Sequence, residues 1–357
     1  MKKNKFLSIL IMVMGAGVFF SCSYNQEIID TSSTSEVEDV VMHSLFSEKV
    51  VRKNWNMSEG GNTVYDITQV GMGLIRPEDN DTLPKDLPQN DEFNATSTQP
   101  FQLTLIINAA QNTTFLVTTL LDYKQVEFKL DGESGLLHEV QFSGNGDLYL
   151  PYELLIPEPG AHDLIVMAFV NPFNRPIDGV IRETPMNCLT AGTRSVIIVD
   201  NNYKPINSAK PNILGTSPPP EIDFGMRVLF ADLPQTPSDL SHPSQRQMKM
   251  SETSHEGEEF KYELWLSNYN MPDDMVDYAL MRFFDYHQID FKGEDMYIVH
   301  FDGREEAIVE DSVMMPNENG IHEIQIIYVF DPYKSLLRNE VLSRFVFSSS
   351  CLGVSVK

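Results

Sequence analysis

An internal repeat constrains the fold of this 357-residue chain more than any other feature. Residues 121–129 recur as residues 284–292, with aspartate, tyrosine, glutamine, phenylalanine and lysine at matching places 163 residues apart. Each copy is followed by a Glu-x-Gly-x-His segment, which ends at His162 or His322, and later by a single cysteine. Similar segments in the same order indicate that one domain has been duplicated.

Short apolar segments, separated by turns rich in Gly, Pro and Asn, run through both copies. In the first copy, apolar and polar side chains alternate over residues 101–108, which is typical of a strand with one buried face. Residues 164–170 are continuously apolar, and we expect them to form the central core strand. The matching segments of the second copy are residues 260–267 and 322–330.

The repeated stretch lies in residues 115–129, whose β-branched side chains favour a strand over a helix. Its counterpart, residues 277–291, is therefore predicted as a strand, although its own pattern also fits a helix. Residues 333–345 have the periodicity of a short helix. With about seven short strands in each copy, the sequence predicts an all-β protein with two tandem antiparallel β-sandwich domains. These resemble immunoglobulin-like domains, without the motifs of a specific family.

The N-terminus has the layout of an export signal. Three lysines lie within residues 1–5, and residues 6–20 are apolar apart from one serine, shorter than the ~20 residues of a membrane-spanning helix. The sequence Phe-Phe-Ser-Cys follows and ends at Cys22. This ending resembles the lipobox of bacterial lipoproteins, with Phe19 in place of the usual leucine. The resemblance, which covers about the first 25 residues, implies cleavage after Ser21 and a diacylglyceryl anchor, with acyl chains such as palmitate, on Cys22. The alternative is an ordinary signal peptide or membrane anchor with an incidental cysteine.

The predicted organisation has five parts. A Ser/Thr-rich segment after Cys22 has the composition of a flexible tether, and three consecutive prolines near residue 219 favour an extended spacer between the domains. The parts are a signal peptide (1–21), a lipidated N-terminus and tether (22–62), a first β-sandwich (63–203), a Pro-rich linker (204–221) and a second β-sandwich (222–357).

The charge of the chain excludes some partners. Without the first 21 residues, the chain has 23 basic and 51 acidic residues, a formal charge of −28. Such a surface repels phosphate backbones and anionic lipid headgroups, so we expect neither nucleic-acid binding nor electrostatic attachment to a membrane.

The repeated histidines, His162 and His322, are candidates for a metal ligand or a general base, since each precedes an acid and an apolar strand. No His-x-His or His-Glu-x-x-His spacing accompanies them. We therefore favour turn histidines whose rings bond the nearby backbone.

The repeated aspartates and the tyrosines that follow them form a second candidate set: Asp122, Tyr123, Asp285 and Tyr286. Each aspartate has a further acid five residues on, Glu127 or Asp290, and glycoside hydrolysis uses two carboxylates. Residues five apart on a strand lie on opposite faces and ~16 Å apart, so neither pair fits this role. A structural role at the start of a strand is the preferred interpretation.

The remaining candidates are weaker. The cysteines that follow the repeats, Cys188 and Cys351, are interpreted as equivalent buried side chains, with an interdomain or intermolecular disulfide as the alternative. Acidic segments at residues 79–81 and 89–92 offer oxygen ligands for Ca²⁺ but lack the EF-hand spacing. Six methionines are candidate copper ligands and two tryptophans are candidate sugar platforms, but neither set has a decisive pattern: Met248, Met250, Met271, Met275, Met314, Met315, Trp55 and Trp265.

The sequence thus predicts a lipoprotein anchored in the cell membrane through Cys22, on the extracytoplasmic side, that acts as a non-catalytic binding or adaptor protein. No catalytic residue, cofactor or metal ligand is assigned, and the partner is a protein or glycan at the surface. The alternatives are an exported hydrolase acting on glycan or peptide, whose active site would assemble from distant loops, and a metal- or solute-binding lipoprotein.

Overall fold

The computed structural model of the protein describes residues 50–55, 70–79, 92–109, 112–144, 146–172, 190–204, 210–215, 227–230, 251–268, 275–303, 305–332, 346–349 and 351–357. Residues 41–357 belong to one compact unit. Cys22, Cys188 and the short helix expected at residues 333–345 lie outside the described residues. No helix among the described residues is long and apolar enough to cross a membrane.

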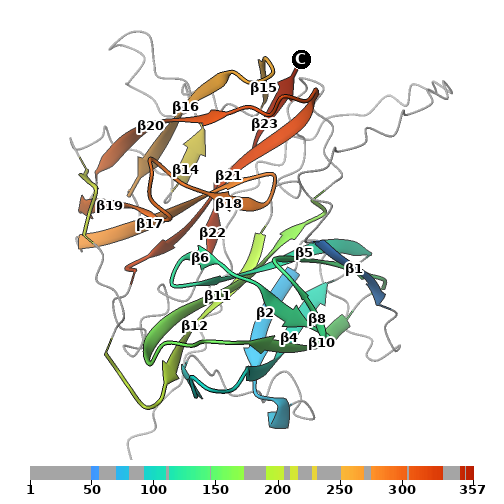
Figure 1. Ribbon diagram of the computed structural model, residues 1–357. Coiled ribbons are helices and arrows are strands. Elements are labelled where there is room, and N and C mark those ends of the chain that lie inside the picture. Colours follow the sequence, from blue (N-terminus) through green and yellow to red (C-terminus); the bar gives the residue numbers. More distant parts are fainter. Residues whose placement is uncertain are drawn as a thin grey trace, which may run out of the picture. The chain divides into compact units, whose positions relative to one another are not determined.

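The first sandwich consists of two sheets (Figure 1). Sheet A has seven strands in the order β1-β9-β5-β11-β12-β3, with β6 paired to β5, and sheet B has five in the order β2-β4-β10-β7-β8. Its strands are β1 (Val50–Trp55), β2 (Val70–Ile75), β3 (Glu92–Ala95), β4 (Phe101–Ala109), β5 (Thr113–Leu121), β6 (Lys124–Gln125), β7 (Phe128–Leu130), β8 (Glu133–Gly135), β9 (Leu137–Phe142), β10 (Gly146–Leu154), β11 (Gly160–Val170) and β12 (Thr190–Val199), with one 3-10 turn, η1 (Pro77–Asp79).

The second sandwich also has two sheets. Sheet C has eight strands in the order β13-β19-β17-β21-β23-β15, with β18 on β17 and β22 on β21, and sheet D has three in the order β14-β16-β20. Its strands are β13 (Ile213–Leu214), β14 (Arg227–Phe230), β15 (Ser251–Ser254), β16 (Glu259–Ser267), β17 (Met275–Phe284), β18 (His287–Ile289), β19 (Tyr297–Asp302), β20 (Glu306–Met314), β21 (Gly320–Phe330), β22 (Phe347–Ser348) and β23 (Leu352–Val356).

The two sandwiches repeat one topology. The central pair β5 and β11 of sheet A corresponds to β17 and β21 of sheet C. Sheet A is completed by parallel edge strands, β1 on β9 and β3 on β12, and sheet C by β13 on β19 and β15 on β23. The predicted all-β architecture of tandem sandwiches with largely antiparallel pairing is confirmed. The parallel edges are an addition that alternation along single strands does not reveal.

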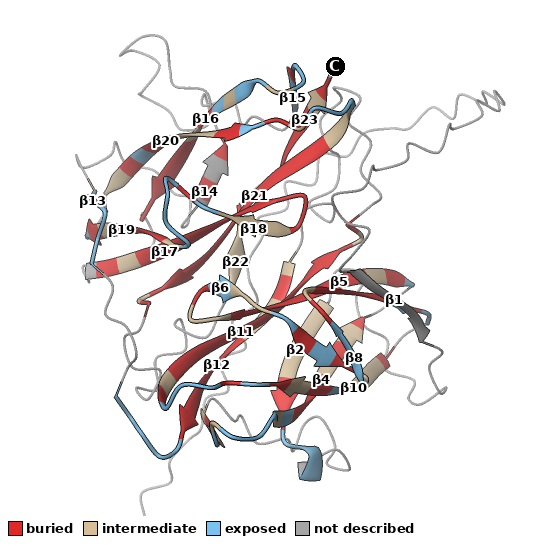
Figure 2. Ribbon diagram, in the orientation of Figure 1, coloured by how far each residue is buried: buried red, intermediate tan, exposed pale blue. Residues whose placement is uncertain are grey.

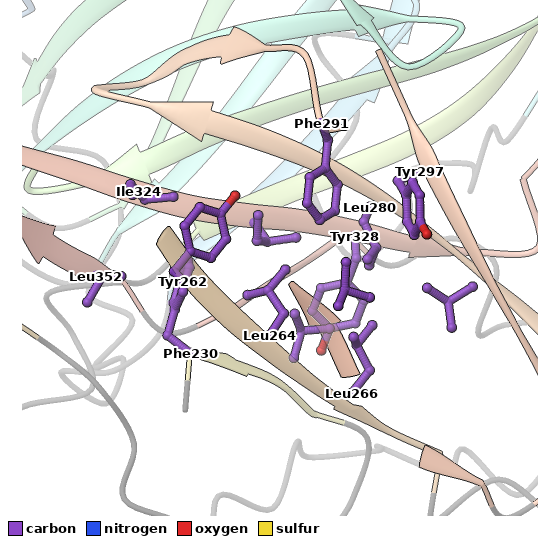
Figure 3. Close-up of a cluster of buried hydrophobic side chains, with 14 of the residues drawn as sticks. Phe230, Tyr262, Leu264, Leu266, Leu280, Phe291, Tyr297, Ile324, Tyr328 and Leu352 are labelled. Atoms are coloured by element: carbon purple, nitrogen blue, oxygen red, sulfur yellow. The ribbon is translucent and has the colours of Figure 1, made fainter. Parts of the chain in front are cut away.

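Each sandwich has its own core between its two sheets. In the second sandwich, Leu264 and Leu266 of β16 face Leu280 of β17 and Tyr328 of β21 (Figure 3). In the first, residues of β4 and β10 pack in the same way against β5 and β11. These are the alternating apolar positions that residues 101–108 and 260–267 predict.

A third cluster, here called the shared core, joins the outer faces of sheets A and C. It consists of Leu116, Leu120, Tyr123, Leu137, Ile165, Met167, Phe169, Ala279, Met281, Phe283, Tyr286, Ile327 and Val329. Alternate residues of β11 therefore enter two different cores: Leu164 and Val166 face sheet B, whereas Ile165 and Met167 face the second sandwich. Burial on both faces explains the continuous apolar run of this strand, and Figure 2 shows β11 and β21 buried along most of their length.

The described strands shift two of the predicted boundaries. β1 lies in the segment 22–62 expected to be a tether, and it pairs with β9. β13 lies in the segment 204–221 expected to be a linker, and it pairs with β19 at the place that β1 takes in the first sandwich. Edge strands like these are held through backbone hydrogen bonds, so their side chains carry little alternation for a sequence pattern to detect.

The predicted continuous strands at residues 115–129 and 277–291 are wrong in one respect. β5 ends at Leu121 and β17 at Phe284, and the chain then turns back on itself into β6 and β18. The repeated stretch is thus a hairpin. Its turn residues, treated below, have no glycine that would have marked them in the sequence.

The strand registers also correct the prediction that Cys188 and Cys351 occupy equivalent positions in the two copies. Leu164 pairs with Ser195 in the first sandwich, and its counterpart Ile324 pairs with Leu352 in the second. Cys351, one residue before Leu352, therefore corresponds to Arg194 and not to Cys188. The equal spacing of the cysteines is a coincidence, because insertions and deletions reduce the offset between the copies from 163 residues at the hairpin to 157 at the last strand. Cys351 is fully buried.

Candidate functional site

The polar residues that the two copies share meet at two hairpin turns, here called the Asp-Tyr turns. Asp122 and Tyr123 connect β5 to β6 with φ angles of 50° and 70°, and Asp285 and Tyr286 connect β17 to β18 with φ angles of 46° and 69°. Two-residue hairpins with both φ angles positive normally contain Asn-Gly or Asp-Gly. A non-glycine residue in this region costs about 1–3 kcal/mol and persists where its surroundings hold it in place.

The aspartate of each turn forms the contacts that stabilise this conformation. The Asp122 carboxylate lies 2.7 Å from His162 Nδ1 and accepts a hydrogen bond of 3.0 Å from the Asp163 backbone N–H. In the second copy, Asp285 lies 2.7 Å from His322 Nδ1 and accepts a bond of 2.8 Å from the Glu323 N–H. Each turn is thereby fixed to the first residues of the neighbouring core strand, β11 or β21. This explains why aspartate and histidine recur together.

The two histidines differ at their second nitrogen. His162 Nε2 lies 2.8 Å from the Glu158 carbonyl oxygen. His322 Nε2 has no hydrogen-bond partner among the described residues, and its ring stacks on Phe284 at 5.4 Å. Burial lowers the pKa of His162, but hydrogen bonds to Asp122 and Glu158 outweigh it, so the net pKa is raised. Burial raises the pKa of Asp285, against the opposing hydrogen bond from His322.

The tyrosines of the turns both pack in the shared core, and Tyr286 also bonds to the opposite sandwich. The Tyr123 hydroxyl donates to Asp163 and accepts a hydrogen bond of 2.8 Å from Arg194 Nη2, and the Tyr286 hydroxyl donates to the carbonyl of Pro172 in the first sandwich. Arg194 forms a fully buried ion pair with Asp163, with Nη2 and Oδ2 at 2.5 Å. Its Nη1 donates to the Phe330 carbonyl at the end of β21, at 2.7 Å.

The glutamines of the repeat bond to each other reciprocally. The Gln125 N–H donates to Gln288 Oε1 at 2.5 Å, and the Gln288 N–H donates to Gln125 Oε1 at 2.9 Å. Their amide groups also cross, from Gln288 Nε2 to the Tyr123 carbonyl and from Gln125 Nε2 to the Tyr286 carbonyl, at 2.7 and 3.3 Å. Equivalent residues that contact each other define a self-complementary interface about a local two-fold axis. The repeated stretch therefore packs on its own second copy.

This arrangement leaves the repeated residues little capacity for catalysis. A general base needs an accessible nitrogen or oxygen within reach of a substrate proton. His162 is 3% exposed, and both of its ring nitrogens lie within hydrogen-bond distance of internal oxygens. His322 and Asp285 are buried as well. The interpretation of the aspartates as structural fits this geometry. The expectation of turn histidines whose rings bond the nearby backbone is wrong in part, because His162 and His322 lie in β11 and β21, and of the two, within the described part of the chain, only His162 contacts a nearby backbone carbonyl, that of Glu158.

Two surface cavities among the described residues lie away from the turns. One of about 540 Å³ is lined by residues that include Asn94, Gln99 and Asn201. A second of about 350 Å³ lies beside β10 and is lined by residues that include Lys129, Tyr152 and Glu153. Neither includes a residue of the Asp-Tyr turns. Among the described residues, no group of three or more His, Cys, Asp or Glu side chains is placed to hold a metal ion.

Some of the other candidate ligand-binding residues from the sequence lie among the described residues, and others do not. Trp265 is buried, 6% exposed, and its indole N–H donates to Glu306 at 2.9 Å, so it is no sugar platform. Met314 is exposed and Met315 is buried, and they do not form one site. The acidic residues 80–81 and 89–91 lie outside the described part of the chain, as does the Trp55 side chain.

Sequence reasoning missed Arg194 and the reciprocal use of the glutamines. Arg194 lies on β12, and its counterpart in the second copy is Cys351, so comparing the copies for repeated residues could not identify it. The available signal was the seven-residue apolar run at residues 164–170 in a strand that a free sandwich would half expose. That run indicates that the strand is buried on both faces. An arginine on a strand that pairs with it is then buried as well, and its charge requires a partner.

No protein-family model matches the chain, and no curated protein matches it. Among solved structures, the CARDB domain of PF1109 from Pyrococcus furiosus is similar at 15% identity and a TM-score of 0.20, covering 30% of this chain and 91% of that one. CBD12 from CALX1.2 is 11% identical at a TM-score of 0.19 and covers 75% and 97%. The C-terminal domain of the Streptococcus pyogenes antigen I/II-family protein AspA is 8% identical at a TM-score of 0.23 and covers 81% and 100%. At such TM-scores these likenesses support no argument about function.

The Asp122–His162 contact predicts a pH-dependent contribution to stability. Since folding raises the pKa of His162, its charge stabilises the fold below the ordinary histidine value of 6.5, and this contribution is lost as the pH rises through the raised value. We expect the difference in unfolding free energy between wild type and His162→Gln to shrink from slightly acidic to slightly alkaline pH. Urea denaturation at a series of pH values measures it. A difference that grows with pH would contradict the raised pKa.

Proposed function

We propose that the protein is a lipid-anchored, extracytoplasmic lipoprotein that acts as a non-catalytic binding or adaptor protein. The observation that carries the proposal is the engagement of the repeated polar residues. In both copies, the aspartate, tyrosine, glutamine and histidine bond to internal partners and hold the hairpin or join the sandwiches. A duplicated enzyme would be expected to leave such residues accessible in at least one copy.

The sequence at the N-terminus supports the location. The charged start, the apolar segment and Cys22 resemble a lipoprotein signal, and a covalent lipid on Cys22 would tether a chain whose charge of −28 repels anionic headgroups. Attachment then depends on the lipid and not on the surface of the sandwiches. The partner in this proposal is a protein or a glycan at the cell surface.

The anchor is tested with the variant Cys22→Ser, with Cys188→Ser as the control for loss of a thiol. After growth with an alkyne-labelled fatty acid, we expect label and membrane association in wild type and Cys188→Ser, and neither in Cys22→Ser. Equal membrane recovery of all three proteins would contradict the anchor.

The binding role is tested by crosslinked co-purification from native membranes with the same three proteins. We expect a partner in near-equal amount with wild type and Cys188→Ser, and its loss with Cys22→Ser. Retention on surface polysaccharide, with release of reducing sugar ends over time, would replace the adaptor role with that of a hydrolase.

A further inference from the structure

The two sandwiches differ at one sheet edge. In the first, β10 lies between β4 and β7, where Tyr152 pairs with Leu130 and Glu153 with Lys129. In the second, the corresponding strand β20 pairs with β16 on one side, and sheet D has no further strand among the described residues. Within the described part of the chain, β20 is therefore a nine-residue edge strand at a position that the first sandwich covers.

A shortened connection accounts for the difference. Phe128 pairs with Gly135 across the β7–β8 hairpin, with six residues between them. The counterpart Phe291 forms a bridge with Glu294, with two residues between them. Four residues that would form the covering hairpin are thus missing from the second copy.

The backbone of β20 points outward at alternate residues. In an antiparallel ladder, the N–H and C=O of one residue face the same neighbour, and successive residues face opposite sides. The Glu305 carbonyl and the Met315 N–H bond to residues next to β16, so odd-numbered residues face β16. The backbone N–H and C=O groups of the even-numbered residues, including Glu306, Ile308 and Met314, therefore point to the open edge.

At the middle of this edge, side chains donate hydrogen bonds to carbonyl groups that a neighbouring strand would otherwise bond. The Glu310 carbonyl accepts a hydrogen bond of 2.9 Å from Lys292 Nζ, and the Ser312 carbonyl accepts one of 2.6 Å from Arg282 Nη1. The strand registers match Glu310 with Pro151 of the first sandwich, whose carbonyl accepts from the Asp131 backbone N–H at 2.8 Å. Lys292 is exposed, so a rotamer change would free the Glu310 carbonyl for a strand amide.

The chemistry of the edge indicates its occupant. Two large apolar side chains, Ile308 and Met314, are 41% and 61% exposed on β20, and Glu306 and Glu310 lie on the same face. β7, which covers the matching edge, has the pattern Phe-Lys-Leu, and its Lys129 bonds to Glu153 at 2.8 Å. A second copy of this chain fits poorly, because antiparallel pairing of two β20 strands centred on Glu310 would oppose like charges.

We propose that the edge of β20 binds an extended segment of a partner protein with alternating apolar and basic residues, which adds to sheet D as a fourth strand. This inference specifies the partner in the proposed binding function and rests on it. Main-chain hydrogen bonds at Ile308 and Glu310 hold the segment, and basic side chains meet Glu306 and Glu310.

The probe is the capped peptide Lys-Phe-Lys-Leu-Lys-Val, added to the chain from residue 23 onward, with a Glu-Phe-Glu-Leu-Glu-Val peptide as the charge-reversed control. We expect saturable binding of the basic peptide and slower hydrogen exchange of the Ile308 amide, with the Ala307 and Val309 amides unchanged because they already face β16. An Ile308 amide that is protected without peptide would overturn the proposal, because the edge would then be occupied already.

Two variants and one matched control separate strand addition from charge attraction. Ile308→Pro removes an outward N–H and leaves the bonds to β16, so we expect about tenfold weaker binding, whereas Ile308→Thr, which keeps the N–H, retains most of it. In a second variant, residues 129–134 replace Lys292-Gly293, so that the restored hairpin covers the edge and abolishes binding. Equal binding by wild type, Ile308→Pro and the hairpin variant would overturn the edge site. That result leaves the Cys22 and co-purification tests of the proposed function unaffected.

Discussion

Replacing Arg194 with methionine is expected to reduce the free energy of unfolding by about 3–5 kcal/mol. Arg194 is 2% exposed and Asp163 is 5% exposed, so the substitution leaves a buried carboxylate without its cation. The loss exceeds that of a surface ion pair, worth about 0–1 kcal/mol, because water cannot replace the missing partner. Urea denaturation measures it through the shift of the transition midpoint.

The same substitution is expected to loosen the contact between the sandwiches. Arg194 donates to the Phe330 carbonyl at 2.7 Å and to the Asp331 carbonyl at 3.4 Å, both in the second sandwich. Hydrogen exchange around residues 330–332 should therefore become faster in Arg194→Met. The double variant Arg194→Met/Asp163→Leu removes the stranded carboxylate and should recover part of the lost stability. Cys351→Ala, at the matching position of the second copy, controls for packing alone. A loss below about 1 kcal/mol in Arg194→Met would show that the pair is not stabilising.

Much of the fold follows from the sequence, because local patterns report local structure. The strands at residues 101–108 and 260–267 show their alternation, and the core strands show their apolar runs. The duplication allowed residues 277–291 to be interpreted from their counterpart, and β17 is a strand as expected. The hairpin within the repeat was missed because Asp122 and Tyr123 adopt positive φ angles without glycine. Their conformation depends on His162 and Asp163, 40 residues away.

The site depends on contacts that no local pattern encodes. Arg194 and the Phe330 carbonyl are 136 residues apart in the chain, and Gln125 and Gln288 are 163 apart. The sequence identified the glutamines as repeated, but not that a residue and its own counterpart are partners. A self-complementary surface gives this outcome, since any duplicated residue near the local two-fold axis meets its copy. Duplication and a doubly buried central strand together are the sequence signature of such packing.

The second large effect is expected in the core of the second sandwich. Arg282 Nη1 lies 2.6 Å from Asp311 Oδ2, and both side chains are 8% exposed. The strand registers match Arg282 with Thr119 and Asp311 with Tyr152, whose hydroxyls lie 3.2 Å apart in the first sandwich. At the same position of the core, the second sandwich thus has a buried ion pair where the first has a neutral hydrogen bond.

This difference allows one copy to serve as the template for repairing the other. Arg282→Thr alone leaves Asp311 buried without a cation, and we expect it to cost about 3–5 kcal/mol in unfolding free energy. Thr119→Val, the control in the first sandwich, removes a neutral hydrogen bond and should cost about 1 kcal/mol.

The triple variant Arg282→Thr/Asp311→Tyr/Tyr262→Leu transplants the neutral trio of the first sandwich, since Leu103 is the counterpart of Tyr262. It should recover most of the loss, because a well-packed neutral set replaces a buried ion pair at little net cost. The urea midpoints of wild type, Arg282→Thr, Thr119→Val and the triple variant measure these differences in stability. A triple variant no more stable than Arg282→Thr would mean that the duplicated cores have diverged beyond exchange. Recovery would mean that the duplicated cores still share one packing scheme, and that the ion pair is a local solution confined to the second copy.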